Sequence, residues 1–489
     1  MRMSACSILE TLETRVSGDY DVVVAGGGAS GLVASLAAAR AGARTALIER
    51  TSSLGGTATA AMVAQWLGFY NRETRVVGGL AMELARRVCT LGGSDGFTRY
   101  TLAEASANPI PLIHFPFNPE ILKIVADEAV QEAGVDVLLH TQVVRPLLSD
   151  RRVEGVAVET PSGRTAMRAK IVVDATGDAA VAAASGVPCA GEEADLRQRR
   201  QPCTLVFRMS NIDVKRFRAV PRDVKRAIAL EGLRQGRLFW ESLSFCSTPG
   251  GTDAICLMSR ISGVDALDGD DLTRAAMTGR QQVKSIVEFL RERVPGFEHS
   301  VLAGIAERVG VRETRRIQGQ YTLTQEDIIN NVRFPDAIAL GAGPMDLHES
   351  DGTGIAMWVP EAPFEIALRC LLPLTIDGLV VTGRAISATR EANSGSRHMG
   401  TAMCLGEAAG MYAALSARGE AQLARPPYKR IRRMLRAQGA LISVEDAFAA
   451  ARVDHAAQRT RRNHSSSLDN TGRRRCRSSE CAAAWWPPH

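Results

Sequence analysis

The chain has 489 residues and a hydrophobic fraction of 45%, enough for the cores of two or three globular domains. Its net charge of +6 comes from basic stretches at 428–436 and 459–477, so the body of the chain is not expected to bind nucleic acid. The ten cysteines form no CxxC pair, which argues against zinc and disulfide frameworks and favours a cytoplasmic setting. No secretory signal or membrane span is expected.

The first predicted elements form a strand–turn–helix–strand unit. A valine-rich strand is predicted at Tyr20–Ala25, followed by a glycine turn at Gly26–Gly31 and an alanine-rich helix to about Ala41. A second strand is predicted at Arg44–Glu49. The turn fits the GxGxxG pattern in the context that a dinucleotide-binding fingerprint requires.

Each residue type in this turn has a physical role in holding a dinucleotide. Gly26 permits the tight turn, Gly28 lets the backbone approach a pyrophosphate, and Gly31 lets the helix pack on the strand. The helix begins at Ala29–Ser30, and its free N–H groups would face the phosphates. Glu49 can accept hydrogen bonds from ribose hydroxyls and would disfavour the 2′-phosphate of NADP. The alternative is a helix-capping turn that binds nothing.

Further along, a helix is predicted from the cap residue Asn118 to about Glu132. Three strands are predicted after it, at Val135–His140, Val153–Glu159 and Ala169–Val173. We expect these three strands to form a β-meander that leads back into the parallel sheet.

The second half of the chain changes character twice. Residues 198–341 carry more charge, with helices predicted near Asp223–Gln235 and Asp271–Arg293. A short apolar strand at Gly378–Thr382 then precedes a long helix at Gly400–Ala417. Beyond about residue 454 the sequence is rich in arginine and serine, and we expect a disordered tail.

Three further motifs extend the dinucleotide signal. Gly55-Gly56-Thr57 follows Arg50 after the second strand, and Ala175-Thr176-Gly177 and Gly383-Arg384 each follow a later strand. In this order the motifs resemble those of FAD proteins of the glutathione-reductase-like superfamily. The resemblance implies FAD as the cofactor. Flavin monooxygenases often have Gly-Asp where this chain has Gly383-Arg384, which argues against the hydroxylase branch.

Later segments narrow the resemblance. The stretch Val311–Ile317 (VRETRRI), the segment Asp346-Leu347-His348 and the block from Gly383 to Gly410 look like motifs of the FAD-dependent oxidoreductase family, related to fumarate reductase flavoproteins. The match covers about residues 20–441. One departure is Ile366-Ala367-Leu368-Arg369, where the family usually shows Ile-Pro-Tyr-Arg, so the wall built there is expected to differ.

The resemblance implies a set of FAD-binding residues and a non-covalent flavin. No histidine that could carry a covalent flavin occurs between Arg50 and Leu112, no redox cysteine pair follows Thr57, and neither an iron–sulfur cluster nor a metal site is expected. The helix at 400–417 is expected to point its N-terminus at the flavin ring. The expected cofactor contacts are Gly26, Gly28, Ala29, Ser30, Gly31, Glu49, Arg50, Gly55, Gly56, Thr57, Val143, Ala175, Thr176, Gly177, Gly383, Arg384, Arg397, Gly400 and Thr401.

Five side chains are candidates for holding a substrate anion or moving a proton. Arginine forks bind carboxylates through paired hydrogen bonds, and histidine titrates near neutral pH. The candidates are Arg312, Arg315, His348, Arg390 and His398. As alternatives, each histidine is an ordinary core or surface residue, and an ion-pair network at a domain interface is formed by Arg312, Glu313, Arg315 and Arg316.

The expected fold class is α/β: a Rossmann-like FAD-binding domain with a parallel sheet and a β-meander, interrupted by an α+β substrate or cap domain. The expected divisions are residues 20–193 and 364–441 for the FAD domain, 194–363 for the insert and 455–489 for the tail.

The leading hypothesis is an FAD-dependent oxidoreductase that dehydrogenates or reduces a small organic substrate, with carboxylates as one candidate class, and that uses an unidentified electron donor or acceptor. The alternatives are a flavoprotein with structural FAD in a non-redox modification or binding role, and a damaged copy, as the tail suggests. The sequence does not indicate an oligomeric state.

Overall fold

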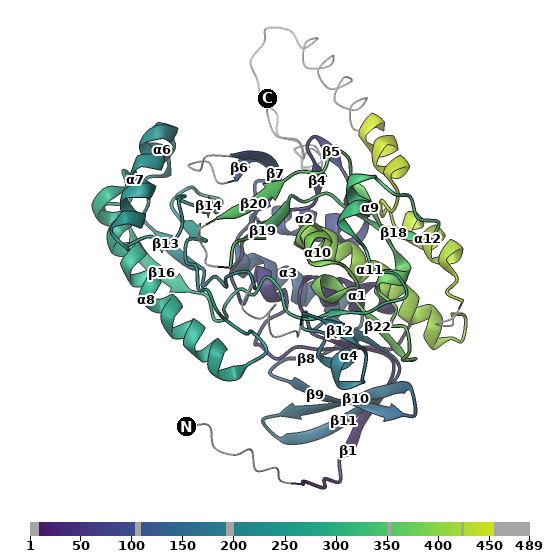
Figure 1. Cartoon of the computed structure of the whole chain (residues 1–489). Coiled ribbons are helices and arrows are strands. Elements are labelled where there is room, and N and C mark those ends of the chain that lie inside the picture. Colours follow the sequence, from purple (N-terminus) through teal and green to yellow (C-terminus); the bar gives the residue numbers. More distant parts are fainter. Residues whose placement is uncertain (1–8, 103–108, 192–199, 351–353, 422–424, 454–489) are drawn as a thin grey trace, which may run out of the picture.

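The computed structural model describes residues 9–102, 109–191, 200–350, 354–421 and 425–453. The expected tail at 455–489 lies outside these residues. The chain has the expected α/β fold, in which one large mixed sheet is flanked by helices and by smaller antiparallel sheets (Figure 1).

The central sheet has seven strands in the order β8-β2-β1-β11-β10-β9, with β22 also paired to β11. The strands are β1 (Arg15–Ala25), β2 (Thr45–Ile48), β8 (Asp136–Leu138), β9 (Gln142–Ser149), β10 (Arg152–Thr160), β11 (Gly163–Asp174) and β22 (Leu379–Val381). The pairs β1–β2, β2–β8, β1–β11 and β11–β22 are parallel. These parallel strands bring the ends of four distant segments to one edge of the sheet.

The apolar run at the end of β1 is buried on both faces, as a parallel strand requires. Val22 and Val24 belong to the larger core with the helices α1 (Ala29–Arg40), α3 (Pro119–Glu132) and α11 (Met399–Ala417). Val23 belongs to a smaller core on the opposite face. The run is therefore continuous rather than alternating because both sides of the strand meet apolar side chains.

Helices α1 and α11 pack side by side, and small residues allow their close approach. A Cβ atom at Gly406 would lie 2.1 Å from the carbonyl oxygen of Ser30, and one at Gly410 would lie 2.1 Å from that of Ala34. The two glycines therefore fix how closely the last helix approaches the helix of the glycine-rich turn.

The predicted β-meander was wrong in its first strand. The segment predicted at 135–140 forms β8, which lies parallel to β2 at the far edge of the sheet. The meander is instead β9-β10-β11, with antiparallel pairing of β10 to both neighbours. Strand β9 escaped prediction because it is an edge strand with polar residues on both faces and a proline at Pro146, which only an edge tolerates.

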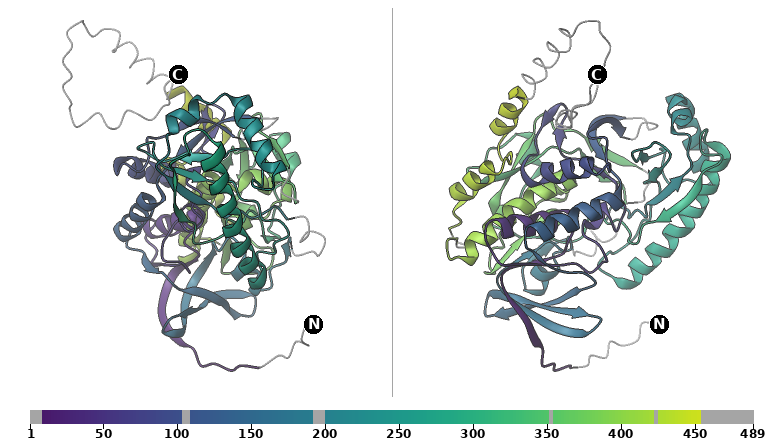
Figure 2. Two further views of the ribbon diagram at one scale, coloured as in Figure 1. Left: turned by 90° about the vertical axis from the view of Figure 1, so that its left-hand side faces the viewer. Right: turned by 180° about the vertical axis from the view of Figure 1, so that it is seen from behind.

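Residues 207–305 form a second unit, seen on one side of the molecule in Figures 1 and 2. It contains an antiparallel sheet in the order β14-β15-β13-β16 and three helices. Two of the helices fulfil the predictions near 223–235 and 271–293. The elements are β13 (Phe207–Ser210), α6 (Val214–Ala219), α7 (Arg222–Arg234), β14 (Phe245–Ser247), β15 (Ala254–Cys256), α8 (Gly269–Arg293) and β16 (Val301–Ile305).

Short elements connect these units. A three-stranded sheet, β3-β7-β6, holds an aromatic cluster in which Trp66 stacks on Phe115 with ring centroids 5.2 Å apart. The short strands are β3 (Gln65–Trp66), β4 (Tyr70–Asn71), β5 (Thr74–Arg75), β6 (Thr98–Leu102), β7 (Ile110–Pro116), β12 (Cys189–Ala190), β17 (Arg316–Ile317), β18 (Ala337–Gly341), β19 (Met345–His348), β20 (Ile355–Trp358) and β21 (Phe364–Ala367). The remaining helices are η1 (Gly56–Ala58), α2 (Gly79–Thr90), α4 (Ala180–Ala184), α9 (Gln325–Ile329), η2 (Leu368–Cys370), η3 (Gly383–Ala385), α10 (Arg390–Ser396) and α12 (Tyr428–Ala437).

Within the described residues, none of the helices has the length and apolar character needed to cross a bilayer, and no group of three side chains is arranged to hold a metal ion.

Candidate active site

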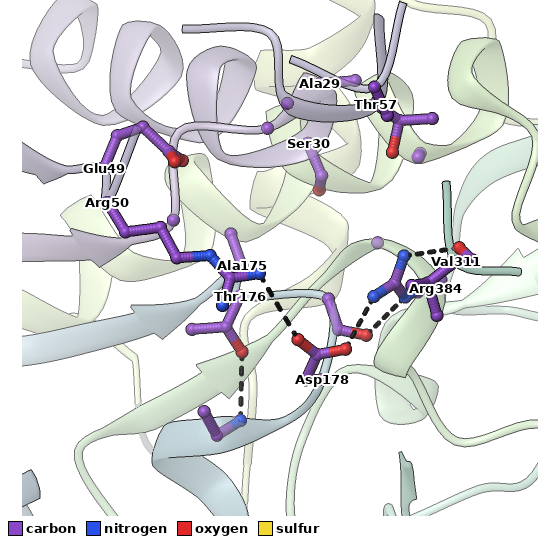
Figure 3. A pocket seen from close by; sticks show the side chains of 18 of the residues that line it. Ala29, Ser30, Glu49, Arg50, Thr57, Ala175, Thr176, Asp178, Val311 and Arg384 are labelled. Carbon is purple, nitrogen blue, oxygen red and sulfur yellow. Dashed lines mark hydrogen bonds and ion pairs between the residues drawn. The ribbon is translucent and has the colours of Figure 1, made fainter. Parts of the chain in front are cut away.

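A long cavity lies where the strands β1, β2, β11 and β22 end and the helix α1 begins (Figure 3). This edge of a parallel sheet is where α/β proteins bind nucleotides. Most of the cofactor contacts predicted from sequence line this cofactor cavity. They are Gly26, Gly28, Ala29, Ser30, Glu49, Arg50, Gly56, Thr57, Val143, Ala175, Thr176, Gly177, Gly383, Arg384 and Arg397.

Of the three glycines of the GxGxxG motif, Gly28 faces open space, whereas Gly26 and Gly31 lie against neighbouring backbone. Gly26 has φ of +101°, and a Cβ atom there would lie 2.6 Å from the carbonyl oxygen of Ala175. At Gly31 a Cβ atom would lie 1.8 Å from the carbonyl oxygen of Gly26. At Gly28 it would meet no protein atom within 4 Å. The space at Gly28 opens on the cavity, as expected for backbone that approaches a pyrophosphate.

Glu49 is fixed by the protein while it faces the cavity. One carboxylate oxygen accepts a hydrogen bond of 2.8 Å from the backbone N–H of Gly27, and the other accepts one of 2.9 Å from that of Thr51. Oε1 also accepts a hydrogen bond of 2.9 Å from the hydroxyl of Thr51, whereas Oε2 keeps a second acceptor site. The open site on Oε2 suits a carboxylate that receives a ribose hydroxyl, the role predicted for Glu49.

Arg384 joins three segments that are far apart in sequence (Figure 3). Its guanidinium donates to the carbonyl oxygen of Gly177 at 2.6 Å, to that of Val311 at 2.8 Å and to the carboxylate of Asp178 at 2.6 Å. Arg50 lies 3.9 Å from the same carboxylate. The side chain thus closes one wall of the cavity mainly by holding protein segments together.

Four predicted contacts do not line the cofactor cavity, namely Gly31, Gly55, Gly400 and Thr401. Gly55 donates its N–H to the carbonyl oxygen of Gly27 at 2.8 Å, so its segment runs beside the glycine turn. Gly400 donates to Leu67 at 3.0 Å. The cavity instead meets the first turn of α11 at Met399 and Ala402. Direct contact with the cofactor stays a prediction for these four residues and for the residues that line the cavity.

A second cavity adjoins the first and is called the substrate cavity below. The two cavities share six lining residues, which are Thr57, Gly310, Val311, Arg312, Arg397 and Met399. Its wall is largely apolar and aromatic, with contributions from Val63, Leu67, Trp240, Phe245, Leu257, Ile355 and Met357. A molecule held here would lie next to one end of the cofactor cavity, shielded from water by these side chains.

Two arginines of the substrate cavity converge on one neutral hydroxyl. Arg312 donates to Thr204 Oγ1 at 3.0 Å and to the carbonyl oxygen of Pro202. Arg260 lies 3.5 Å from the same hydroxyl, and its guanidinium covers the ring of Trp240 at 4.4 Å. Within the described ranges, no carboxylate lies at ion-pair distance from either arginine.

Burial makes these two positive charges costly. It lowers the pKa of Arg312 to about 10, and burial followed by the charge of Arg312 lowers the pKa of Arg260. A guanidinium nevertheless stays protonated in proteins. The unfavourable burial therefore favours binding of an anion that would compensate the charges.

Asp346 connects the substrate cavity to the wall shared with the cofactor cavity. It lies 3.0 Å from Nε2 of His348 and 3.3 Å from the guanidinium of Arg397. Although burial opposes ionisation, His348, Arg397 and Arg312 hold the pKa of Asp346 well below its usual value. The carboxylate is therefore ionised and holds both neighbours in place.

The five candidate catalytic residues fall into two groups. His348, Arg312 and His398 line the substrate cavity. His398 donates its Nε2–H to the carbonyl oxygen of Pro344 at 2.8 Å, and burial lowers its pKa. Arg390 lies in neither lining and pairs with Glu313 at 3.1 Å. Arg315 also lines neither cavity.

Sequence reasoning missed several residues of the site. Asp346 stands two residues before His348 on β19, and this spacing places both side chains on one face of a strand. That signal was available in the sequence. Arg260, Trp240 and Asp178 carried no local pattern, because only the tertiary fold brings them to the cavities.

The residues that line the cofactor cavity fit a flavin dinucleotide. Gly28 leaves the open space that a pyrophosphate needs, and Glu49 is oriented at the end of the second strand. Near the shared wall, the Nε atom of Arg397 is buried without a partner. The βαβ unit, the glycine turn and the cavity define a dinucleotide-binding protein of the Rossmann type.

The chain belongs to the FAD dependent oxidoreductase family, whose sequence model matches residues 21–435. The protein is therefore an oxidoreductase with FAD as its cofactor.

Several known proteins are similar over part or most of the chain. Digeranylgeranylglycerophospholipid reductase 1 of Methanopyrus kandleri is 31% identical over 164 residues, which cover 32% of this chain and 40% of that protein. A geranylgeranyl bacteriochlorophyll reductase-like protein from Thermoplasma acidophilum is 14% identical, with a TM-score of 0.46 over 88% of this chain and 85% of that chain. The myxobacterial halogenase CndH is 15% identical, with a TM-score of 0.43 over 93% and 92%.

Proposed function

We propose that this enzyme oxidises or reduces a small organic carboxylate, held in the substrate cavity beside non-covalently bound FAD. The observation that carries the proposal is the pair Arg260 and Arg312, two buried guanidinium groups that meet at Thr204 without a carboxylate partner in the described residues. A substrate carboxylate would supply the missing negative charge through paired hydrogen bonds.

The remaining groups fit the same role. FAD supplies the acceptance or donation of a hydride. The aromatic and aliphatic wall, including Trp240 and Phe245, excludes water and accepts the carbon skeleton of the substrate. Arg397 lies on the wall shared by the cavities, where a positive charge favours electron density on the flavin. The seven cysteines in the described ranges are unpaired, which agrees with the proposed cytoplasmic setting.

The proposal is tested by an anaerobic visible spectrum of the purified holoprotein. Small carboxylic acids and their methyl esters are added in parallel, and bleaching near 450 nm reports reduction of the flavin. Dithionite-reduced protein is treated with unsaturated acids and esters in the same way. We expect an acid, and not its ester, to change the redox state of the flavin.

Two variants sharpen the test. Arg260→Gln and Arg312→Gln should each raise the concentration of acid needed by about 10- to 100-fold, since each loses charge-assisted hydrogen bonds. Arg280→Gln, an exposed change on α8, is the control and should have no effect. Equal reactivity of acid and ester would refute a carboxylate substrate. Bound flavin that responds only to dithionite would instead support the non-redox role.

A further inference from the structure

His348 is placed to accept a proton from a molecule in the substrate cavity. Its Nε2 atom lies 3.0 Å from Oδ1 of Asp346, an ionised oxygen that has no aligned hydrogen-bond donor and can only accept. We therefore assign the ring proton to Nε2, next to this negative charge. The backbone N–H of His348 donates to Gln201 at 3.2 Å, and its ring meets that of Trp240 at 6.5 Å. The ring therefore lies between Asp346 and Trp240, and its unprotonated Nδ1 is the atom that can accept a proton.

The charges around His348 come from several elements. Asp346 lies on the same strand, Arg260 and Arg312 come from two loops, and Arg397 comes from the end of α10. The other titratable groups that line the cavity with it are Tyr100 and His398.

In the absence of an anion this environment disfavours a protonated histidine. Burial is the main cause and the charge of Arg312 the next, and together they lower the pKa of His348 to about 3. Asp346 opposes the shift, and Arg260 adds to it. Two of these causes are the charges of Arg312 and Arg260, the guanidinium groups that we propose to bind the substrate.

We propose that an organic anion bound between Arg260 and Arg312 makes His348 the proton acceptor of the site. This inference rests on the proposed function, because it requires a substrate with a negative charge. The bound carboxylate would offset one of the two positive charges that repel a protonated His348, while Asp346 would remain to stabilise the imidazolium. His348 would therefore become a useful base only when the correct class of molecule fills the cavity.

The proton balance fits oxidation of a hydroxy acid. The carbinol carbon would lose its hydrogen as a hydride to the flavin, the hydroxyl would lose its proton to Nδ1 of His348, and a carbon–oxygen double bond would form.

Proton uptake on anion binding tests this without any turnover. Benzoate, a carboxylate with no oxidisable hydroxyl, is titrated into the oxidised holoenzyme at pH 6 by calorimetry in buffers of different ionisation enthalpy. Because the anion removes part of the charge repulsion while burial remains, the pKa of His348 should rise part of the way toward its usual value. A fraction of a proton should therefore be taken up per benzoate bound, and that fraction should grow as the pH falls. Affinity should then rise as the pH falls from 8 to 6.

Variants assign the proton to one residue. His348→Asn should bind benzoate with almost no proton uptake, whereas the exposed His299→Asn should behave as the wild type. If the variant does not fold, a ¹⁵N NMR spectrum of the wild-type histidine rings reports the protonation of His348 directly. Before benzoate is added, His348 should carry a proton on Nε2 alone. Benzoate binding without proton uptake, or a proton on Nδ1 of the free enzyme, would overturn this inference and leave the proposed function intact. Failure of benzoate, acetate and succinate to bind at all would refute the anion site itself.

Discussion

A buried carboxyl group in the last helix should give the protein a distinctive loss of stability with rising pH. Glu407 lies on α11 with no exposed surface, and it accepts a hydrogen bond of 3.1 Å from the backbone N–H of Leu80 at the start of α2. Its other oxygen has no partner. Burial raises the pKa of Glu407 from 4.5 to about 8. The group is therefore protonated in the folded protein at neutral pH.

The sign of the effect follows from where the proton is held. Between pH 4.5 and 8 the unfolded chain loses this proton and the folded chain keeps it, so the contribution to stability is lost as the pH rises. At pH 7 the gap of 2.5 units from the unfolded value corresponds to about 3 kcal/mol. Glu407→Gln keeps the shape and the acceptor for Leu80 but cannot ionise. Its stability relative to the wild type should therefore rise by about 3 kcal/mol from pH 4.5 to 7.

The assay is urea unfolding of the holoprotein at several values from pH 4.5 to 8, followed by far-ultraviolet circular dichroism. Glu128→Gln on α3, an exposed change, is the control and should run parallel to the wild type throughout. If the Glu407→Gln and wild-type curves also run parallel between pH 5 and 8, the carboxyl group does not hold a proton in the folded state and the reasoning fails.

The other predictions concern the cofactor cavity and its supports. Gly28→Ala should leave the thermal stability of the apoprotein within about 1 kcal/mol of wild type but weaken FAD binding at least tenfold in equilibrium dialysis, because the new methyl group meets no protein atom. Gly31→Ala should instead lower the melting temperature of the apoprotein itself, since its Cβ would lie 1.8 Å from a carbonyl oxygen. Arg384→Lys keeps the charge but loses the three-way fork, and it should cost about 1–3 kcal/mol of FAD binding by the same dialysis. Glu313→Gln should destabilise the protein at pH 7. Although burial opposes it, hydrogen bonds and ion pairing lower the pKa of Glu313, so the wild-type advantage in urea should disappear as the pH falls below 4.5.

The cofactor half of the molecule was predictable because its chemistry is local. The turn from Gly26 to Gly31 encodes its own backbone shape, and a strand before it and a helix after it follow from short-range patterns. The motifs around Thr176 and Gly383 meet the same cavity because both follow strands that are parallel to β1. Their order along the chain was sufficient to predict one site.

The substrate half could be predicted only in part. His348 and Arg312 were recognisable from family-like segments, whereas Arg260 follows a short strand of the second unit and has no characteristic neighbours. Its convergence with Arg312 on Thr204 depends on three segments that are distant in sequence. Burying two positive charges near each other is unfavourable without a bound anion. No sequence propensity or periodicity therefore predicts that Arg260 and Arg312 lie close together.

The charges of the substrate cavity also make sense when they are considered together with the cofactor. The charged side chains among its described lining residues are three guanidinium groups, of Arg260, Arg312 and Arg397, and one carboxylate, that of Asp346, which leaves a net charge of +2. Under the proposed function, a substrate carboxylate would compensate one of these charges, and the negative charge of the reduced flavin would compensate the other. Because Arg397 lines both cavities, binding of the substrate anion and reduction of the flavin draw on the same positive field. If the substrate is the proposed acid, the positive charges would stabilise the complex of bound anion and reduced flavin, and they would thereby favour oxidation of the substrate by the enzyme-bound flavin.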